Sequence, residues 1–350
     1  MNRSPKPSPF LMPGLSLFLA ASLLALAGCA ASPGPAAQAE SPAAQPDGGD
    51  GTAAAAPGPP SSYPIFVSNC GTDVTLTAPP ERIVAIKSTS LETVLALGLG
   101  SKVVGTAFLD GPVPPSLAAA AEGIPSLSDA APSQEVVLER EPDFIYAGWE
   151  SNLSADAAGE RDALASLGIS TYVSPAACRE EGAPGKLTFE AVFDDIVEAG
   201  NLLGAPEAAA DLVAEQRKVL AGIEPAGAGR TAFWFSSGRD TPYAGAGLGA
   251  PQMMMETLGL ENIAGSVEDA WASLSWETVV AANPDVIVLA DADRNTAESK
   301  KELLAANPAT AGMDAVINER YLVLPFAAGE AGVRNTDAVA DLNDQLAKLQ

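Results

Sequence analysis

Two stretches of the chain share one residue pattern, and this pattern decides the fold. The first is SQEVVLEREPDFI at Ser133–Ile145, and the second is SWETVVAANPDVI at Ser275–Ile287. In both, Ser-x-Glu opens the stretch, Pro-Asp follows the Glu by seven residues, and the copies are offset by 142 residues throughout. Serine favours a helix N-cap, and an apolar run after a Pro-Asp turn is typical of a buried strand. Each copy therefore predicts a short helix, a turn and a strand.

Further strands and helices are expected around each copy. Apolar runs of the kind that parallel sheets bury occur at 82–87, 102–108, 143–148, 170–174, 230–236, 285–290 and 321–326. Helical stretches alternate with them at 91–97, 159–167, 251–258, 297–306 and 337–349. This alternation predicts α/β lobes with mostly parallel sheets. One repeat in each half indicates two pseudo-symmetric lobes with a cleft between them.

A long helical connection is expected between the lobes. Phe189–Val197 keeps helical spacing, and Pro206 suits the first position of a second helix that runs to about Ile223. At 1.5 Å per residue that helix spans roughly 27 Å, which limits how far two lobes swing. We expect an N-terminal lobe at 63–187, a connecting segment at 188–224 and a C-terminal lobe at 225–350.

The start of the chain predicts an export signal peptide, a lipidated cysteine and a flexible stalk. Residues 1–28 have a short basic start and an apolar run, as an export signal peptide does. The run ends in Leu-Ala-Gly-Cys at 26–29, which resembles the lipobox of bacterial lipoproteins and implies lipidation of Cys29. Residues 29–62 are almost entirely Ala, Pro, Gly and Ser after that cysteine, a composition typical of a flexible stalk.

Composition excludes several function classes. The formal net charge is −25, which disfavours nucleic acid and anionic lipid as partners. The chain has no histidine, so Ser-His-Asp or Cys-His catalysis and His-ligated metal or haem are excluded. We predict no metal site, no cofactor and no catalytic residue. Outside the cytoplasm Cys70 and Cys178 are expected to form a disulfide; the alternative is two buried free thiols.

The order and spacing of these segments resemble a known family. The opening RIVAIKSTSLETVLALGLGSKVVG at 82–105, both Ser-x-Glu repeats and Gly259–Ile263 are similar to substrate-binding proteins of ABC importers whose lobes are joined by one long helix. That class includes cobalamin, ferric-siderophore and haem binders. The segments 105–114, 146–154, 172–178, 243–253 and 330–335 most resemble an actinobacterial clade proposed to bind F-420-0, a deazaflavin coenzyme precursor.

The resemblance implies a fold, a location and partners. The fold is the class III periplasmic-binding-protein type, and the protein is extracytoplasmic, a monomer, and held at the cell membrane only by its lipid. Its partners are a small-molecule ligand and an ABC permease dimer with its ATPase subunits. Carried over by position, Glu135 and Glu277 meet arginines of the permease, since a carboxylate accepts a bidentate Arg fork. The alternative is that both glutamates only cap or solvate short helices.

Loops at the carboxyl ends of the strands are expected to line the cleft. An anionic aromatic ligand requires basic, polar and stacking groups there, and a Gly-rich loop before a helix can hold phosphate through its N–H groups. The candidates are Lys87, Ser88, Thr89, Trp149, Glu150, Ser151, Tyr243, Gly245, Gly247, Gln252, Trp271, Arg334 and Asn335. For Lys87 the alternative is a structural salt bridge.

Two other functions stay open at this point. The first keeps the fold and changes the ligand from F-420-0 to cobalamin or a ferric siderophore. The second is a carboxylate-based hydrolase of the cell envelope, because acidic residues are abundant. The lipobox and the 142-residue repeat favour the binding protein.

Overall fold

The computed structural model describes residues 62–349 of the 350-residue chain. The predicted signal peptide at 1–28, the lipidation site Cys29 and nearly all of the predicted stalk lie outside the described residues. Within residues 62–349, no helix is long and apolar enough to cross a membrane.

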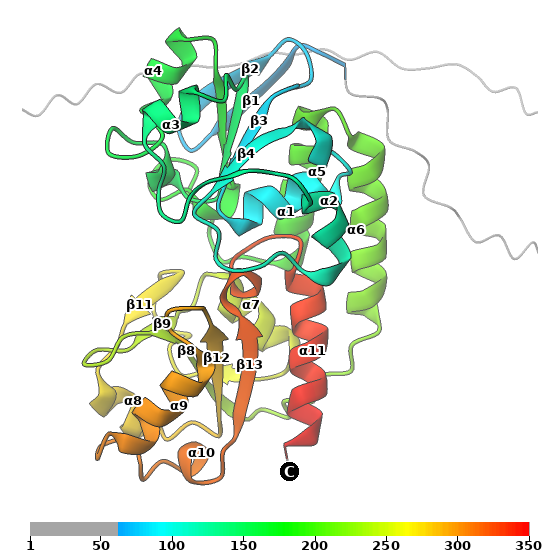
Figure 1. The fold of residues 1–350 in the computed structure, drawn as a ribbon. Helices are drawn as coiled ribbons and strands as arrows, with labels where there is room; N and C mark the ends of the chain where they lie inside the picture. The colour runs from blue at the N-terminus through cyan, green and yellow to red at the C-terminus, as the bar shows by residue number, and fades with distance from the viewer. Residues whose placement is uncertain (1–61, 350) are drawn as a thin grey trace, which may run out of the picture. The chain divides into compact units, whose positions relative to one another are not determined.

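The N-terminal lobe is built on a five-stranded sheet in the order β5-β4-β3-β6-β7, with every pair parallel (Figure 1). A hairpin of β1 and β2 precedes it. The strands are β1 Ile65–Asn69, β2 Thr72–Leu76, β3 Ile83–Ile86, β4 Val103–Ala107, β5 Ser126–Ser128, β6 Phe144–Ala147 and β7 Ser170–Val173. The α-helices are α1 Ser88–Ala96, α2 Ala118–Ala121, α3 Gln134–Leu138 and α4 Arg161–Ser166.

The C-terminal lobe is built on a mixed sheet in the order β11-β9-β8-β12-β13, and β10 also pairs with β8. Strands β8, β10, β12 and β13 are parallel, whereas β9 and β11 run antiparallel to their neighbours. The strands are β8 Thr231–Ser237, β9 Tyr243–Gly245, β10 Glu261–Asn262, β11 Trp271–Ser273, β12 Val286–Asp291 and β13 Tyr321–Pro325. The helices are α7 Ala250–Thr257, α8 Trp276–Ala282, α9 Ala297–Ala306, α10 Asp314–Ile317 and α11 Asn335–Lys348. Short 3-10 turns lie at Gly100–Lys102, Pro115–Leu117, Glu150–Asn152, Pro175–Ala177 and Phe326–Gly329.

The repeated sequence folds twice into the same unit. Ser133 caps α3 by accepting the N–H of Val136, and Ser275 caps α8 by accepting the N–H of Thr278. The repeated Asp also has one role in both copies. Asp143 accepts the backbone N–H of Arg82 just before β3, and Asp285 accepts that of Thr231 at the start of β8. The Pro-Asp turn thus joins each repeat to the neighbouring strand of its sheet.

Helices α5 (Phe189–Leu203) and α6 (Pro206–Ala221) connect the two sheets in the chain. Gly204 ends α5 with a left-handed φ of 78°, and Pro206 starts α6 at its first position. One buried apolar core includes residues of both sheets, both connecting helices and α11, among them Phe144, Phe193 and Trp234. Because this core continues from one lobe into the other, the connecting helices are packed into the body of the protein. The α/β fold with a mostly parallel sheet in the first lobe is confirmed.

Candidate ligand-binding site between the lobes

The carboxyl ends of β3, β4 and β6 bring Lys87, Phe108, Asp110 and Trp149 together. Lys87 follows β3, and its ammonium forms an ion pair with Asp110, which follows β4. The Lys87 Nζ lies 3.7 Å from the centre of a Trp149 ring and 4.5 Å from that of Phe108. Phe108 meets Trp149 edge to face, with ring centres 5.6 Å apart. A cation over aromatic faces is stabilised by the ring quadrupole, and more so when water is excluded.

The backbone at these strand ends has unusual geometry. Lys87 and Phe108 are not glycines, yet their φ values are 81° and 54°. Such conformations cost on the order of 1–3 kcal/mol each, and in proteins they gather at functional sites. Gly148 allows this approach, because a Cβ there would lie 2.5 Å from the Cβ of Lys87.

The C-terminal lobe closes the same site from the other side. Phe326 follows β13, and its ring centre lies 5.7 Å from the Lys87 Nζ. Trp149 donates its indole N–H to Glu330 Oε2 at 2.8 Å, a hydrogen bond between the lobes. Burial raises the pKa of Glu330 above its ordinary value, and the charge of Asp110 adds to this effect. The hydrogen bond from Trp149 and the charge of Lys87 oppose it only in part. We call Lys87, Phe108, Asp110, Trp149, Phe326 and Glu330 the lysine cage.

A second contact between the lobes is an ion pair of Arg334 with Glu92. The guanidinium of Arg334 donates two hydrogen bonds to the Glu92 carboxylate, one from Nε and one from Nη2. The same Nη2 also donates to the carbonyl of Pro112. Only 1% of the Glu92 side chain is exposed, and 12% of Arg334. Burial raises the pKa of Glu92, and Arg334 opposes this. The positive charge expected to meet an anionic ligand is therefore already paired in this structure.

The remaining predicted polar residues divide into two sets. Ser88 and Thr89 are buried beside the lysine cage, where Ser88 accepts the backbone N–H of Asp110. Glu150 follows Trp149 and accepts the backbone N–H of Arg179, and Ser151 is exposed.

Gln252 and Asn335 instead serve the internal structure of the C-terminal lobe. Gln252 bonds with Asn262 and Glu256, and Asn335 holds the carbonyls of Ala328 and Glu330. Asn335 thus fixes the loop that carries Glu330.

Part of the glycine-rich loop of the C-terminal lobe donates its backbone N–H groups to neighbouring carbonyls. Gly245 lies in β9, paired with Trp271 of β11, and the N–H groups of Gly247 and Leu248 donate to the carbonyls of Val267 and Asp269. Neighbouring carbonyls thus already accept these two N–H groups, and phosphate binding by this loop stays a prediction. Tyr243 and Trp271 stack with ring centres 6.0 Å apart, so this part of the lobe presents an aromatic pair.

A small cavity lies where both lobes meet α5. It is lined by Thr93 of α1, Tyr146 of β6, Ser174 after β7, Asp195 of α5 and Gly332 before α11, among others, and its volume is about 20 Å³. That is room for one water molecule. Burial raises the pKa of Asp195 to about 7, with further contributions from Glu198 and Asp194.

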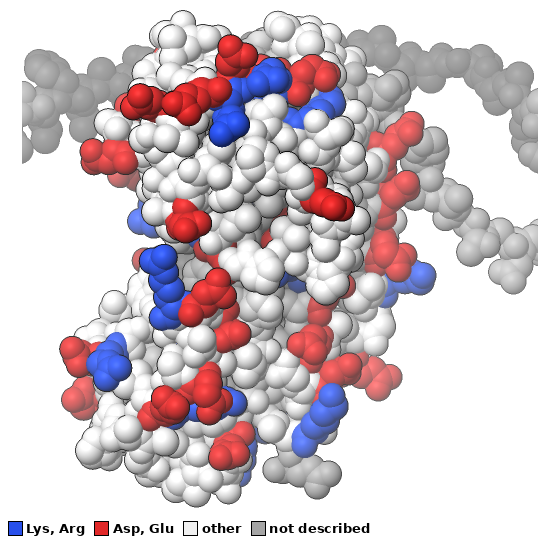
Figure 2. All heavy atoms as spheres, viewed as in Figure 1, with Lys and Arg blue, Asp and Glu red and all other residues white. Residues whose placement is uncertain are grey.

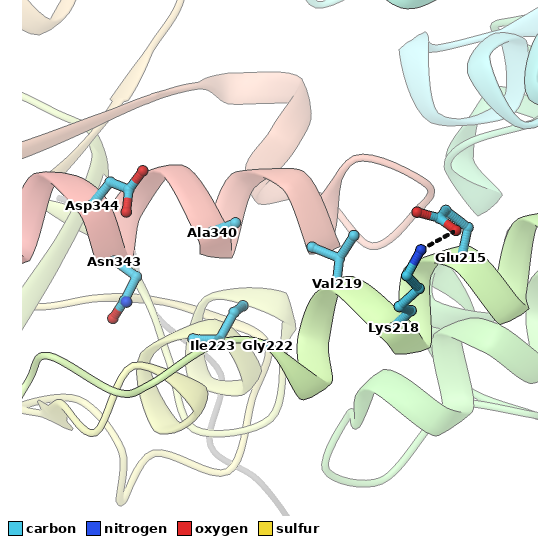
Figure 3. A pocket seen from close by; sticks show the side chains of 8 residues that line it. All are labelled: Glu215, Lys218, Val219, Gly222, Ile223, Ala340, Asn343 and Asp344. Atoms are coloured by element: carbon cyan, nitrogen blue, oxygen red, sulfur yellow. Dashed lines mark ion pairs between the residues drawn. The ribbon is translucent and has the colours of Figure 1, made fainter.

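A larger hollow of about 320 Å³ lies between α6 and α11, away from the strand ends (Figure 3). Its lining includes Glu215, Lys218, Asn343 and Asp344, and Glu215 pairs with Lys218. It contains no aromatic side chain and none of the predicted site residues. The site at the strand ends is therefore the better candidate for an organic ligand.

The two predicted docking glutamates lie on equivalent helices. Glu135 is in the first turn of α3 and Glu277 in the first turn of α8, and both are exposed. A hydrogen bond with its own backbone and one with Ser275 lower the pKa of Glu277. Figure 2 shows acidic groups spread over both lobes on one face.

The disulfide prediction is confirmed. Cys70, in the turn between β1 and β2, is bonded to Cys178, after β7, across 108 residues of sequence. Among residues 62–349, no group of three or more Cys, Asp or Glu side chains is placed to hold a metal ion.

Comparison with known proteins agrees with this architecture. The family model described as "Periplasmic binding protein" matches residues 83–328. An uncharacterised ABC transporter substrate-binding lipoprotein of Bacillus subtilis, YvrC, is 25% identical over an alignment of 294 residues that covers 81% of this chain and 86% of the relative. The chain therefore belongs to the periplasmic binding protein family, whose members are substrate-binding proteins of transporters and not enzymes.

Solved structures show the same fold. A periplasmic binding protein from Veillonella parvula superposes with a TM-score of 0.71 at 28% identity, covering 82% of this chain and 98% of that one. An ABC-type Fe3+-hydroxamate transport system protein from Saccharomonospora viridis gives 0.69 at 27% identity, covering 81% and 99%. The heme binding protein HmuT gives 0.61 at 18% identity, covering 83% and 92%, a likeness of fold alone.

Proposed function

We propose that this chain is the substrate-binding lipoprotein of an ABC importer, anchored outside the cytoplasm through Cys29, and that it captures an aromatic small molecule between its lobes. The observation that supports this most is the lysine cage. Aromatic side chains from strand ends of both lobes surround one buried ion pair there. Ligand sites of α/β proteins lie at such carboxyl ends. A shell of aromatic side chains suits a ligand with an aromatic ring, because such rings stack or meet edge to face.

The particular ligand that we propose is F-420-0, on the resemblance of the loop segments to that clade. The aromatic groups Trp149, Tyr243 and Trp271 suit its ring system. Its anionic part requires a cation, and Arg334 supplies one if the lobes separate enough to break its pair with Glu92. The small volume at the lobe junction agrees with such a separation before the ligand enters.

A ferric siderophore is the second candidate. The Saccharomonospora viridis protein, 27% identical in sequence, is described as part of an Fe3+-hydroxamate transport system. Lys87 and Arg334 are both paired with carboxylates, which also suits a ligand that needs little positive charge. Cobalamin is the third candidate ligand, and no observation on the described residues favours it.

Delivery to the permease is assigned to Glu135 and Glu277. Each lies in the first helical turn of one sequence repeat, exposed and at an equivalent position in its lobe. Two exposed carboxylates, one on each lobe, suit a permease dimer that presents arginine on each half.

Uptake of F-420-0 by cells that carry the chain and its permease tests this function. We expect Glu135→Arg with Glu277→Arg to abolish uptake and leave F-420-0 affinity unchanged, because both side chains are exposed. Glu139→Arg with Glu298→Arg is the matched control, because it makes the same charge change at two other exposed glutamates. Glu139 lies at the C-terminal end of α3, and Glu298 lies on α9. Normal uptake by the double docking variant would contradict the assignment.

A further inference from the structure

Asp110 holds a buried oxygen without a hydrogen-bond partner. Its Oδ1 pairs with Lys87, whereas Oδ2 has no donor among residues 62–349. Only 8% of the Asp110 side chain is exposed. A buried carboxylate oxygen left without a donor costs free energy, on the order of 1–3 kcal/mol or more for a charged group. Such a group in a native protein calls for an explanation, and a ligand that supplies the donor is one.

The charges of the lysine cage point the same way. Lys87 is its one cation, against the two carboxylates Asp110 and Glu330. Arg334 and Glu92, the next charged groups along the lobe junction, are paired with each other. The cage therefore has one carboxylate more than it has cations, and it complements a group that brings hydrogen-bond donors or positive charge.

The two carboxylates of the lysine cage lie on different lobes. Asp110 belongs to the N-terminal lobe and pairs with Lys87, whereas Glu330 belongs to the C-terminal lobe and accepts the indole N–H of Trp149. A planar donor group fits between aromatic faces and donates two N–H bonds in one plane.

We propose that Asp110 and Glu330 are ligand-binding residues that together accept hydrogen bonds from a planar N–H-bearing group of the ligand, such as an amidine, a guanidine or an N–H heterocycle. This rests on the proposed function and specifies the ligand class at that site. Because the two carboxylates lie on different lobes, a donor that bonds both stabilises the closed arrangement. Trp149 packs on this group and Lys87 offsets one carboxylate charge.

Methylguanidinium is a suitable probe, because it has the planar donor group and nothing else. The chain has four tryptophans, so the indole N–H region of a 1H–15N spectrum contains four signals, assigned with single Trp→Phe variants. We expect methylguanidinium to shift the Trp149 signal saturably. The signal of Trp276, which donates to the Arg239 carbonyl within the C-terminal lobe, is expected to stay unchanged. Tetramethylammonium, a cation without N–H donors, is expected to leave the Trp149 signal in place at equal ionic strength.

Two variants decide the outcome. Asp110→Asn and Glu330→Gln each remove one negative charge and are each expected to weaken methylguanidinium binding about tenfold or more. The second variant carries the test if the first does not fold. An unchanged affinity in the folded variants, an equal response to tetramethylammonium, or no Trp149 shift in the wild type would overturn the proposal. If methylguanidinium behaves as expected and F-420-0 does not bind, the donor site stands and the ligand named above is wrong.

Discussion

Replacing Asp195 by Asn is expected to stabilise the protein at alkaline pH and to have little effect under acidic conditions. Asp195 lies on α5 at the cavity between the lobes, close to Glu198 and Asp194. Burial, with those neighbours, raises its pKa from the ordinary 3.8 to about 7. The folded protein therefore keeps a proton that the unfolded chain has already released.

The magnitude follows from linkage. Between pH 4 and pH 7 the native state binds more protons at Asp195 than the unfolded state, so stability falls as the pH rises, by about 1.4 kcal/mol for each pH unit. Over the interval from 3.8 to about 7 the ceiling is about 4 kcal/mol. Because the side chain keeps partial contact with solvent, we expect about half of this, roughly 2 kcal/mol, at pH 8.

Urea unfolding followed by tryptophan fluorescence at pH 4.5, 6 and 8 measures the effect, on the chain produced from Ala30 onward. Asp194→Asn is the matched control, because Asp194 is the exposed neighbour on the same helix. The free energy of unfolding of Asp195→Asn should exceed that of the wild type increasingly as the pH rises. A difference that is equal at pH 4.5 and pH 8, or that Asp194→Asn reproduces, would refute the burial of this carboxylate.

Two more predictions concern stability. Arg334→Met should lower the free energy of unfolding by about 3 kcal/mol, since it leaves a carboxylate buried alone, and adding Glu92→Gln should recover part of it in the same urea assay. An additive double variant would show that the two side chains do not interact. Replacing both Cys70 and Cys178 by Ser should cost about 4–5 kcal/mol in the chain-entropy model, because the bridge spans 108 residues. An unchanged denaturation midpoint in that variant would show that the bridge adds no stability.

Much of the fold follows from residue patterns. Continuous apolar runs such as 143–148 and 285–290 indicated the buried strands β6 and β12, since strands covered on both faces need apolar residues at every position. The hairpin β1–β2 was missed, although Ile65–Asn69 alternates between more and less exposed residues, because its turn is Cys70-Gly71 in place of the usual Asn-Gly. The antiparallel β9 and β11 are three residues each, too short to give a periodic signal.

The candidate site could be predicted only in part. Lys87 and Trp149 were found because they follow strand ends directly, and Phe108 and Asp110 follow β4 in the same way, so the same signal was present for them. Glu330 carries no such signal, because its partner Trp149 is 181 residues away. The Arg334–Glu92 pair was missed for the same reason, at a separation of 242 residues. Contacts between lobes depend on how the lobes pack, which no local pattern contains.

The most direct test of the account is an equilibrium titration of the chain from Ala30 onward with F-420-0, a ferric hydroxamate and cobalamin, followed by intrinsic tryptophan fluorescence. We expect saturable quenching by F-420-0, with an affinity that Trp149→Ala weakens at least tenfold. Trp271→Ala is expected to have a smaller effect, because Trp271 lies outside the lysine cage. Saturable binding of the ferric hydroxamate alone would support the function as a substrate-binding protein and show that F-420-0 is not its ligand. Binding of F-420-0 that Trp149→Ala leaves unchanged would contradict the central claim, that the ligand sits between the lobes at the lysine cage.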